Sequence, residues 1–312
     1  MPIVAFGTYV ADGPETPAVI CDGAVYDAAG LRDAGVDLPR ENWSNGEIGQ
    51  FLENLCADRR DWSDLAARVG EAAAAGKVSD LAGKVKLQAP FRPHRIFCAA
   101  SNFVDHADEM GTVLAAKVDS KPYMFLKLQN CVIGPNEPVT MPEATEKLDW
   151  EVELAAVIGK RARHVSASDA LQYVAAYSVV NDVTARDMNV RSDYPFKFDW
   201  FQGKCHDGFA PFGPWLVPAA QIPDPQKVRL RLSVNGEVMQ DGTAEEMIWK
   251  VNEQIAYLSQ VMTLKPGDIL ATGTPSGVGV ARKPPVFLQP GDVMRVEIDG
   301  IGHIENTVVA EA

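Results

Sequence analysis

The chain has 312 residues, of which 46% are hydrophobic, enough to form one large core or two unequal ones. The net charge of −13 argues against nucleic acids and anionic membranes as partners. No apolar run approaches the roughly 18 residues of a membrane span, no signal peptide is recognisable, and five widely spaced cysteines suit a reducing cytoplasm.

The N-terminal part of the chain divides into two patterns. Residues 1–35 alternate short apolar runs with Gly and Asp turns, which predicts a small β unit. Residues 47–86 are rich in alanine with helical spacing of apolar residues. Pro90 and Pro93 then interrupt any helix and indicate a boundary near residue 88. We therefore expect a small N-terminal α/β domain over residues 1–87 and a catalytic domain over residues 88–312.

The second part is dominated by β signals. Strands are predicted at residues 95–100, 123–128, 151–159, 177–184, 228–240, 268–274 and 293–309. Asn235-Gly236 is a strong hairpin signal. Helices are predicted at residues 168–177, with Ser168 as N-cap, and at residues 244–262. Because the strands do not alternate regularly with helices, the pattern argues against a doubly wound parallel sheet.

Acidic residues occupy alternate positions in the stretch LDWEVELAAVIGK, namely Asp149, Glu151 and Glu153. Alternate side chains of a strand point to one face about 7 Å apart, so three like charges would repel one another and lose hydration. One interpretation is a solvent-facing strand paired with Lys147 and Lys160. The other is a site for a hard divalent cation such as Mg²⁺, Mn²⁺ or Ca²⁺.

A fourth acid favours the cation. Asp182 follows an apolar β run in YSVVNDVTARD, at the point where the strand should end. Strand ends at the mouth of a sheet commonly supply site residues. Two glutamates on one strand and an aspartate at the tip of a neighbour would form a face of three carboxylates, with the remaining coordination positions left for water and substrate.

His106 and Glu109 lie three residues apart in SNFVDHADEMG. On a short helix they would share a face. A carboxylate that accepts a hydrogen bond from one imidazole nitrogen leaves the other nitrogen free to take a proton from water. The alternative is an unrelated surface pair in a polar loop.

Three basic residues have two interpretations each. Lys127 lies inside a predicted apolar strand and Lys204 follows FQG, so both are candidates for a buried charge, yet a lysine there could simply pair with an acid or extend to solvent. Arg186 lies four residues after Asp182 and fits a carboxylate fork, or forms a salt bridge with Asp187 or another neighbouring acid. The stretch TGTPSGVG lacks the ending of a P-loop, so its pattern indicates a Gly/Pro turn.

Four stretches in this order and spacing resemble the fumarylacetoacetate hydrolase family: LDWEVELAAVIGK, VVNDVTARDMN, FQGKCHDGFAPFGPWLV and LKPGDILATGTPSGVG. The likeness covers about residues 88–312. It implies an α+β, β-rich fold, with a mixed β-roll as the catalytic domain, and a homodimer. It also implies a metal, usually Mg²⁺ or Mn²⁺, held by Glu151, Glu153 and Asp182, with Asp149 as a flanking acid. Asn102 stands where some members have an additional acidic ligand.

The resemblance also assigns roles to the remaining candidates. His106 and Glu109 would activate water, on a segment over residues 101–120 that closes on bound substrate. Lys127 and Lys204 would neutralise substrate oxygens and a developing enolate. Arg186, Asn189 and Thr274 would contact substrate, with Thr274 and nearby backbone N–H groups cradling a carboxylate. Asn189 stands where relatives often have Gln.

We therefore expect a metal-dependent hydrolase that cleaves the C–C bond of an acylpyruvate or related β-diketo acid, a reaction of aromatic catabolism. Its partner would be a small 2-oxo acid, bound through its carboxylate and 2-oxo oxygens. Other enzymes on the same fold remain alternatives: decarboxylation of a β-keto acid, hydration or isomerisation of a dienoate, and ureidoglycolate cleavage. A non-catalytic, metal-stabilised module is the last alternative, and the lysines, the arginine and the His–Glu pair argue against it.

Overall fold

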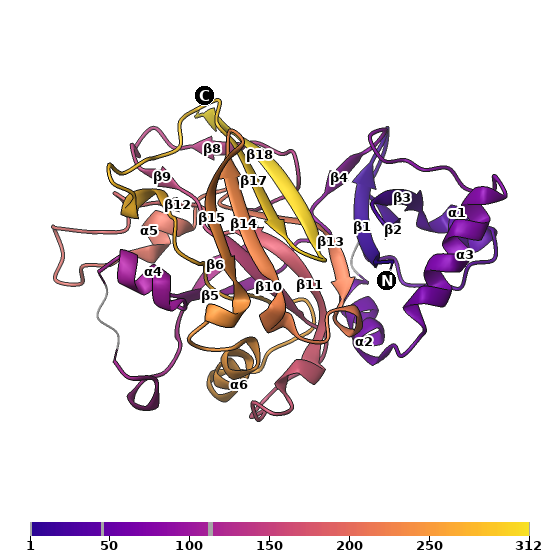
Figure 1. The fold of residues 1–312 in the computed structure, drawn as a ribbon, viewed down its shortest axis with the longest axis horizontal. Coiled ribbons are helices and arrows are strands. Elements are labelled where there is room, and N and C mark those ends of the chain that lie inside the picture. The colour runs from indigo at the N-terminus through magenta and orange to yellow at the C-terminus, as the bar shows by residue number, and fades with distance from the viewer. Residues whose placement is uncertain (1, 45–46, 112–114, 312) are drawn as a thin grey trace.

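The computed structural model describes residues 2–44, 47–111 and 115–311. The N-terminal part lies to the right in Figure 1, beside the large β structure formed by the rest of the chain. Its elements are β1 (Val4–Val10), β2 (Thr16–Cys21), β3 (Ala24–Asp27), α1 (Ala28–Asp33), α2 (Ile48–Ala57), α3 (Trp62–Ala74) and β4 (Lys86–Gln88). The expected β unit and helical region are therefore present, with α1 as an additional short helix capped by the Asp27 side chain.

The larger part consists mainly of strands. Its first half contains β5 (Arg95–Ala100), α4 (Val104–Glu109), β6 (Tyr123–Leu128), β7 (Val132–Ile133), β8 (Val139–Met141), β9 (Leu148–Asp149), β10 (Val152–Ile158), β11 (Val174–Asn181) and β12 (Thr184–Ala185). Its second half contains α5 (Trp200–Lys204), β13 (Ala210–Pro218), β14 (Arg229–Val234), β15 (Glu237–Thr243), α6 (Val251–Val261), β16 (Ile269–Ala271), β17 (Val293–Ile298) and β18 (Gly302–Ala310).

Two mixed sheets pack against each other and confirm the β-rich α+β class. The larger has the order β3-β2-β1-β13-β11-β10-β16-β5-β6, and the smaller has the order β15-β14-β17-β18-β8. Apolar residues of β10 and β11, such as Leu154 and Val179, share one core with Leu232 and Val296 of the smaller sheet. The sheet continues into the N-terminal part because β1 pairs with β13. The proposed boundary near residue 88 stays a prediction.

Several predicted strands are confirmed. The predicted strands 95–100 and 123–128 coincide with β5 and β6. Asn235 and Gly236 both adopt positive φ angles, at 52° and 84°, in the hairpin between β14 and β15. The predicted strand 268–274 is shorter than expected, because β16 ends at Ala271 and the chain then turns.

The helix predicted at residues 168–177 is wrong. Residues Ala170–Tyr173 form a 3₁₀ turn, and β11 begins at Val174. Ser168 bonds the Ser166 hydroxyl instead of capping a helix. Strand β11 lies between β10 and β13 and is buried along its whole length. Tertiary burial therefore overrides the local helical spacing.

The helix predicted at residues 244–262 is shorter than expected. Residues Ala244–Glu246 form a 3₁₀ turn, and α6 begins only at Val251. The interruption has a clear cause: the backbone N–H groups of Ile248 and Trp249 donate to the backbone and side-chain oxygens of Asn102, at 2.7 and 2.8 Å.

Two further expectations concern the surroundings of the protein. All five cysteines are free, and the cytoplasmic location inferred from them stays a prediction. Within the described residues, no helix combines the length and the apolar character needed to cross a bilayer.

Candidate functional site

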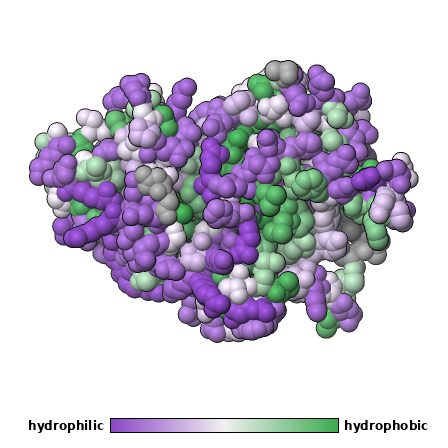
Figure 2. All heavy atoms as spheres, turned by 180° about the vertical axis from the view of Figure 1, so that it is seen from behind, coloured by the Kyte–Doolittle hydropathy of each residue, from purple (hydrophilic) through white to green (hydrophobic). Residues whose placement is uncertain are grey.

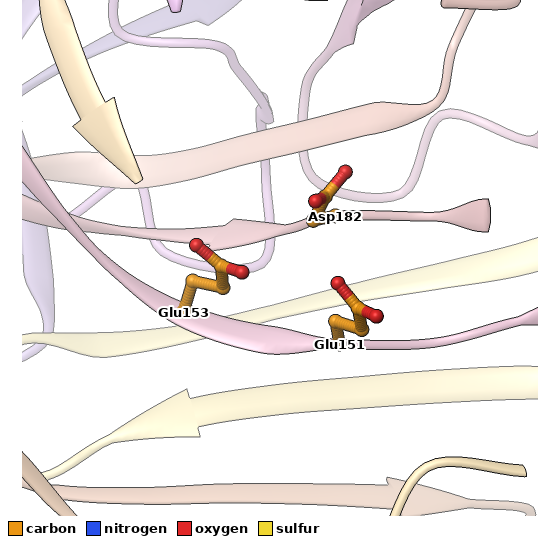
Figure 3. Close-up of side chains that lie close together, drawn as sticks. All are labelled: Glu151, Glu153 and Asp182. Atoms are coloured by element: carbon orange, nitrogen blue, oxygen red, sulfur yellow. The ribbon is translucent and has the colours of Figure 1, made fainter. Parts of the chain in front are cut away.

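Glu151, Glu153 and Asp182 are brought together by the pairing of β10 with β11. Val152 faces Asn181 in the antiparallel register, and the Asp182 N–H donates to the Glu151 carbonyl at 2.9 Å. One carboxylate oxygen of each acid lies within 4.8 Å of the others, and all three side chains are buried (Figure 3). Burial excludes a solvent-facing strand face. Three hard oxygen donors in this arrangement fit Mg²⁺ or Mn²⁺.

Two buried lysines neutralise part of this charge. Lys204, at the end of α5, places its Nζ 2.9 Å from Glu151 Oε2 and 2.6 Å from Asp182 Oδ2. Lys127 on β6 forms an ion pair with the other Asp182 oxygen and donates to the Val183 carbonyl at 3.0 Å. Neither lysine extends to solvent. Each is paired with an acid of the three-carboxylate group, so Asp182 is held by an ammonium group on both sides.

The two glutamates have opposite pKa shifts. Burial tends to raise the pKa of Glu151, but the charges of Lys204 and Arg186 outweigh it and hold this pKa below its usual value. For Glu153, burial and then the charges of Asp182 and Glu151 raise the pKa well above the usual value. Glu153 is therefore the acid whose negative charge is least compensated, and a bound cation would supply that compensation.

Arg186 and Asp149 form a second charge pair beside this group. Arg186 donates from Nε to Asp149 Oδ2 at 2.8 Å and from Nη2 to Glu151 Oε1 at 2.7 Å. Asp149 also accepts from the backbone N–H groups of Gly279 and Val280, at 2.7 and 3.0 Å. Arg186 thus forms the salt bridge expected as its alternative role, but with Asp149 and Glu151 and not with Asp187. It orients Glu151, and a contact between Arg186 and substrate stays a prediction.

His106 and Glu109 share one face of α4, as their spacing predicts. His106 Nδ1 lies 2.8 Å from Glu109 Oε1, and the second Glu109 oxygen accepts from the Gly277 N–H at 2.8 Å. The His106 side chain is buried, which excludes an unrelated surface pair. The His106–Glu109 pair is attached to the turn whose Gly273 N–H donates to Glu153, so one turn links it to the three-carboxylate group.

The turn after β16 holds Thr274 next to the carboxylates through a residue that sequence reasoning missed. Gln240 is buried on β15, where it accepts from the Val152 N–H at 3.0 Å and donates to Thr274 Oγ1 and the Pro275 carbonyl, both at 2.8 Å. It therefore joins the strand of the glutamates to the turn. A single glutamine in an ordinary strand pattern gives no signal of this role.

The backbone N–H groups of this turn differ from the expected carboxylate cradle. Gly273 donates to Glu153 Oε2 at 2.8 Å, and Ser276 donates to Asp105 Oδ2 at 3.0 Å. Gly277 adopts a φ of 104°, and a Cβ atom there would lie 2.1 Å from the Met239 carbonyl oxygen. The amides thus bind the protein's own carboxylates, and the Thr274 hydroxyl remains the candidate for binding substrate.

Two asparagines named from the sequence, Asn102 and Asn189, are both buried. Asn102, at the position of an additional acidic ligand in some relatives, donates its amide to the carbonyls of Trp249 and Thr272 at 3.0 and 2.8 Å, so its role is to join loops. Asn189 is buried and its Oδ1 has no hydrogen-bond partner in the described parts of the chain. A Cβ at position 203 would lie 1.7 Å from that oxygen, which explains Gly203.

Comparison with known proteins identifies relatives of this chain. Residues 95–309 match the family model described as fumarylacetoacetate (FAA) hydrolase C-terminal. A human protein named as a mitochondrial oxaloacetate tautomerase is 43% identical over 218 residues, which are 70% of this chain and 67% of the relative.

Two solved structures are similar as well. A fumarylacetoacetate hydrolase from psychrophilic Exiguobacterium antarcticum is 34% identical with a TM-score of 0.78, and the match covers 99% of this chain and 100% of that one. A fumarylpyruvate hydrolase from Pseudomonas aeruginosa, in complex with Mn²⁺ and pyruvate, is 33% identical with a TM-score of 0.63, over 72% of this chain and 91% of that one.

The three-carboxylate group generates a prediction on metal affinity. Glu151→Gln, Glu153→Gln and Asp182→Asn each remove one anionic ligand, so each should weaken Mn²⁺ binding at least tenfold in calorimetry. Asp187→Asn is a matched control, because Asp187 binds Thr145 and the Glu146 N–H outside the group. Mn²⁺ affinity that stays at the wild-type value in all three variants would show that the acids do not form the cation site.

The opposite pKa shifts generate a prediction on stability without divalent cations. An acid whose pKa is raised on folding destabilises the folded state above its usual pKa of 4.5, whereas an acid whose pKa is lowered stabilises it there. At pH 8 in EDTA, Glu153→Gln should therefore raise the melting temperature and Glu151→Gln should lower it, each by about 2 °C or more. Calorimetric melting that shifts in the same direction for both variants would contradict this charge assignment.

Proposed function

The chain belongs to the fumarylacetoacetate hydrolase family, and on that premise we propose that it cleaves a C–C bond of an acylpyruvate or related β-diketo acid. The observation that carries the proposal is the buried His106–Glu109 pair, held by the same turn that binds Glu153 of the three-carboxylate group. A non-catalytic metal site needs no such pair. The Pseudomonas relative, with its bound Mn²⁺ and pyruvate, supports both the cation and the 2-oxo acid.

The residues that would hold the cation are Glu151, Glu153 and Asp182. A bound Mg²⁺ or Mn²⁺ supplies a Lewis acid for the 2-oxo group of the substrate. Lys204 lies between Glu151 and Asp182, so its ammonium group is placed to stabilise negative charge that develops on the same substrate oxygen. Thr274 accepts from Gln240, which leaves its hydroxyl hydrogen free to donate to the substrate carboxylate.

The His106–Glu109 pair would activate the water. Glu109 accepts from the Nδ1–H of His106, so the Nε2 lone pair is free to take a proton from water. The hydroxide adds to the distal carbonyl carbon, and the bond from that carbon to C3 breaks. The electron pair of the broken bond becomes the pyruvate enolate, which is protonated at C3, and the acyl part leaves as a carboxylic acid.

A second candidate is keto–enol tautomerisation of oxaloacetate, which the 43% identity with the human tautomerase supports. It passes through the same enolate of a 2-oxo acid. Lys204 and the three carboxylates would keep their roles, whereas His106 would move a proton at C3 instead of activating water. The two candidates therefore share the charge-stabilising residues and differ in the task of the histidine.

A second copy of the chain is the partner that fits the exposed aromatic surface near the site, which we call the aromatic face. Its members are exposed by 56–75%: Tyr123, Tyr194, Phe196, Phe198 and Phe201. Tyr123 and Phe198 both pack on Trp200, and Tyr194 packs against Phe196. The surface seen from behind is largely hydrophilic, but hydrophobic residues gather near its middle (Figure 2).

The size of the aromatic face argues for self-association. At roughly 200 Å² for a fully exposed aromatic side chain, the five residues offer about 700 Å², more than the largest apolar patch of a typical monomer. This is close to the ~800 Å² that each partner contributes to a stable interface. Strand β6, which carries Tyr123, is also the edge of the large sheet, and an exposed apolar edge strand favours association.

The task of His106 generates a kinetic prediction. With Mn²⁺ bound, His106→Ala and Glu109→Ala should reduce cleavage of an acylpyruvate such as fumarylpyruvate by about 10²–10⁴-fold, the usual contribution of a general base. Decarboxylation of oxaloacetate, if the wild type catalyses it, needs only the enolate to be stabilised and should fall much less. Lys204→Met should damage both reactions.

The same assays decide between the candidates. If the wild-type enzyme interconverts the enol and keto forms of oxaloacetate but cleaves neither fumarylpyruvate nor any other acylpyruvate tested, the tautomerase is the correct function. A decarboxylase would instead be favoured by two results together. The wild type would decarboxylate oxaloacetate faster than it cleaves any acylpyruvate, and His106→Ala and Glu109→Ala would cleave acylpyruvates at the wild-type rate.

The aromatic face generates a prediction on mass. Wild-type protein should sediment as a dimer of about twice the chain mass of 33.8 kDa, and Phe196→Glu with Phe198→Glu should sediment as a monomer because the new charges prevent burial. Val238→Glu on β15 is the control at an exposed apolar position outside the face. A monomeric wild type, or a double variant that stays dimeric, would refute this interface.

A further inference from the structure

The short helix α4 is attached to the turn after β16 by two carboxylates that share one geometry. Glu109 binds the His106 ring with one oxygen and the Gly277 N–H with the other. Asp105 does the same with the histidine backbone: Oδ1 accepts from the His106 N–H at 2.8 Å, and Oδ2 accepts from the Ser276 N–H at 3.0 Å. His106 is therefore linked twice to consecutive amides of one turn.

We propose that Asp105 is a positioning residue for His106. Asp105 docks α4 on the turn at residues 273–280, and the docked helix holds the imidazole near the carboxylates. The proposal rests on the general-base role of His106 proposed above. Asp105 touches no reacting atom in this account. It acts by fixing the start of the helix, while Glu109 fixes the ring at its end.

Apolar packing holds only part of this helix. The helix spans only Val104–Glu109, and its N-cap Phe103 forms no side-chain capping bond. Val104 and Met110, at its two ends, are 57% and 39% exposed, whereas Phe103 before the helix and Ala107 within it are buried. Apolar packing therefore fixes one side of the helix. Isolated helices of this length are unstable in water. The docking of α4 on the turn therefore needs the two carboxylates in addition to the packing of Phe103 and Ala107.

The turn that receives α4 is itself fixed relative to the metal ligands. Gln240 joins the Val152 N–H, between the two glutamates, to the Pro275 carbonyl directly before Ser276. Gly277 fits only without a side chain, because a Cβ would meet the Met239 carbonyl. A continuous series of bonds thus runs from β10 through Gln240 and the turn to Asp105, and it sets the distance from the carboxylates to His106.

Asp105→Asn tests the role with little change of size. Asparagine has one accepting oxygen, so it can keep only one of the two bonds that Asp105 accepts. The matched control is Asp108→Asn, which removes the same charge from an exposed side chain of the same helix. Mn²⁺ affinity, measured by calorimetry, should stay at the wild-type value in both variants, which shows that the fold and the carboxylate group are intact.

The first readout is hydrogen exchange with Mn²⁺ bound. In Asp105→Asn, amides of residues 104–111 and 273–280 should exchange about tenfold faster than in wild type and in the control, since a hydrogen bond to a charged group is lost. The second readout is the kinetics of acylpyruvate cleavage. Here kcat should fall about tenfold, as expected for loss of one such bond, while KM should change much less, because substrate contacts are untouched.

Each outcome has a defined meaning. Unchanged exchange in Asp105→Asn would overturn the docking role, whether or not the enzyme is a hydrolase, because exchange does not depend on the reaction. Faster exchange with unchanged kcat would overturn the positioning of His106. Asp105→Ser also removes the second acceptor and should show the same faster exchange. If Asp105→Asn folds poorly, the exchange of Asp105→Ser decides the result.

Discussion

The site concentrates negative charge where bulk water does not reach, and most of its architecture compensates that charge. Its buried acids are Asp149, Glu151, Glu153 and Asp182. Unpaired carboxylates in such a place would take up protons, which would make them poor ligands for a cation. Lysines and an arginine form ion pairs with three of them, whereas within the described residues Glu153 is bound by a backbone N–H alone. That imbalance leaves one charge for a divalent cation to neutralise.

The turn at residues 273–280 is the second centre of the site. Its amides donate to acids from three parts of the chain: Gly273 to Glu153, Ser276 to Asp105, Gly277 to Glu109, and Gly279 and Val280 to Asp149. One turn therefore sets the relative positions of the metal ligands, the general base and the Arg186 pair. It also explains why the stretch is rich in glycine, since close approach of the backbone leaves no space for side chains.

The sequence predicts those parts of the site that depend on local spacing. Alternation along a strand identifies Glu151 and Glu153, the end of an apolar run identifies Asp182, and a separation of three residues pairs His106 with Glu109. Contacts between distant segments are a different matter. Asp105 meets Ser276 across 171 positions, and no local pattern encodes that contact. The helix expected at residues 168–177 fails for the same reason, because its burial in the sheet depends on strands that are remote in sequence.

The central claim is that the three acids form one cation site whose charge balance is completed by the metal. Anomalous diffraction at the manganese edge, from crystals grown with Mn²⁺, tests it most directly. We expect one strong anomalous peak within bonding distance of Glu151, Glu153 and Asp182, with Lys204 still paired to the carboxylates. A peak held by other residues, or none among these three acids at saturating Mn²⁺, would contradict it.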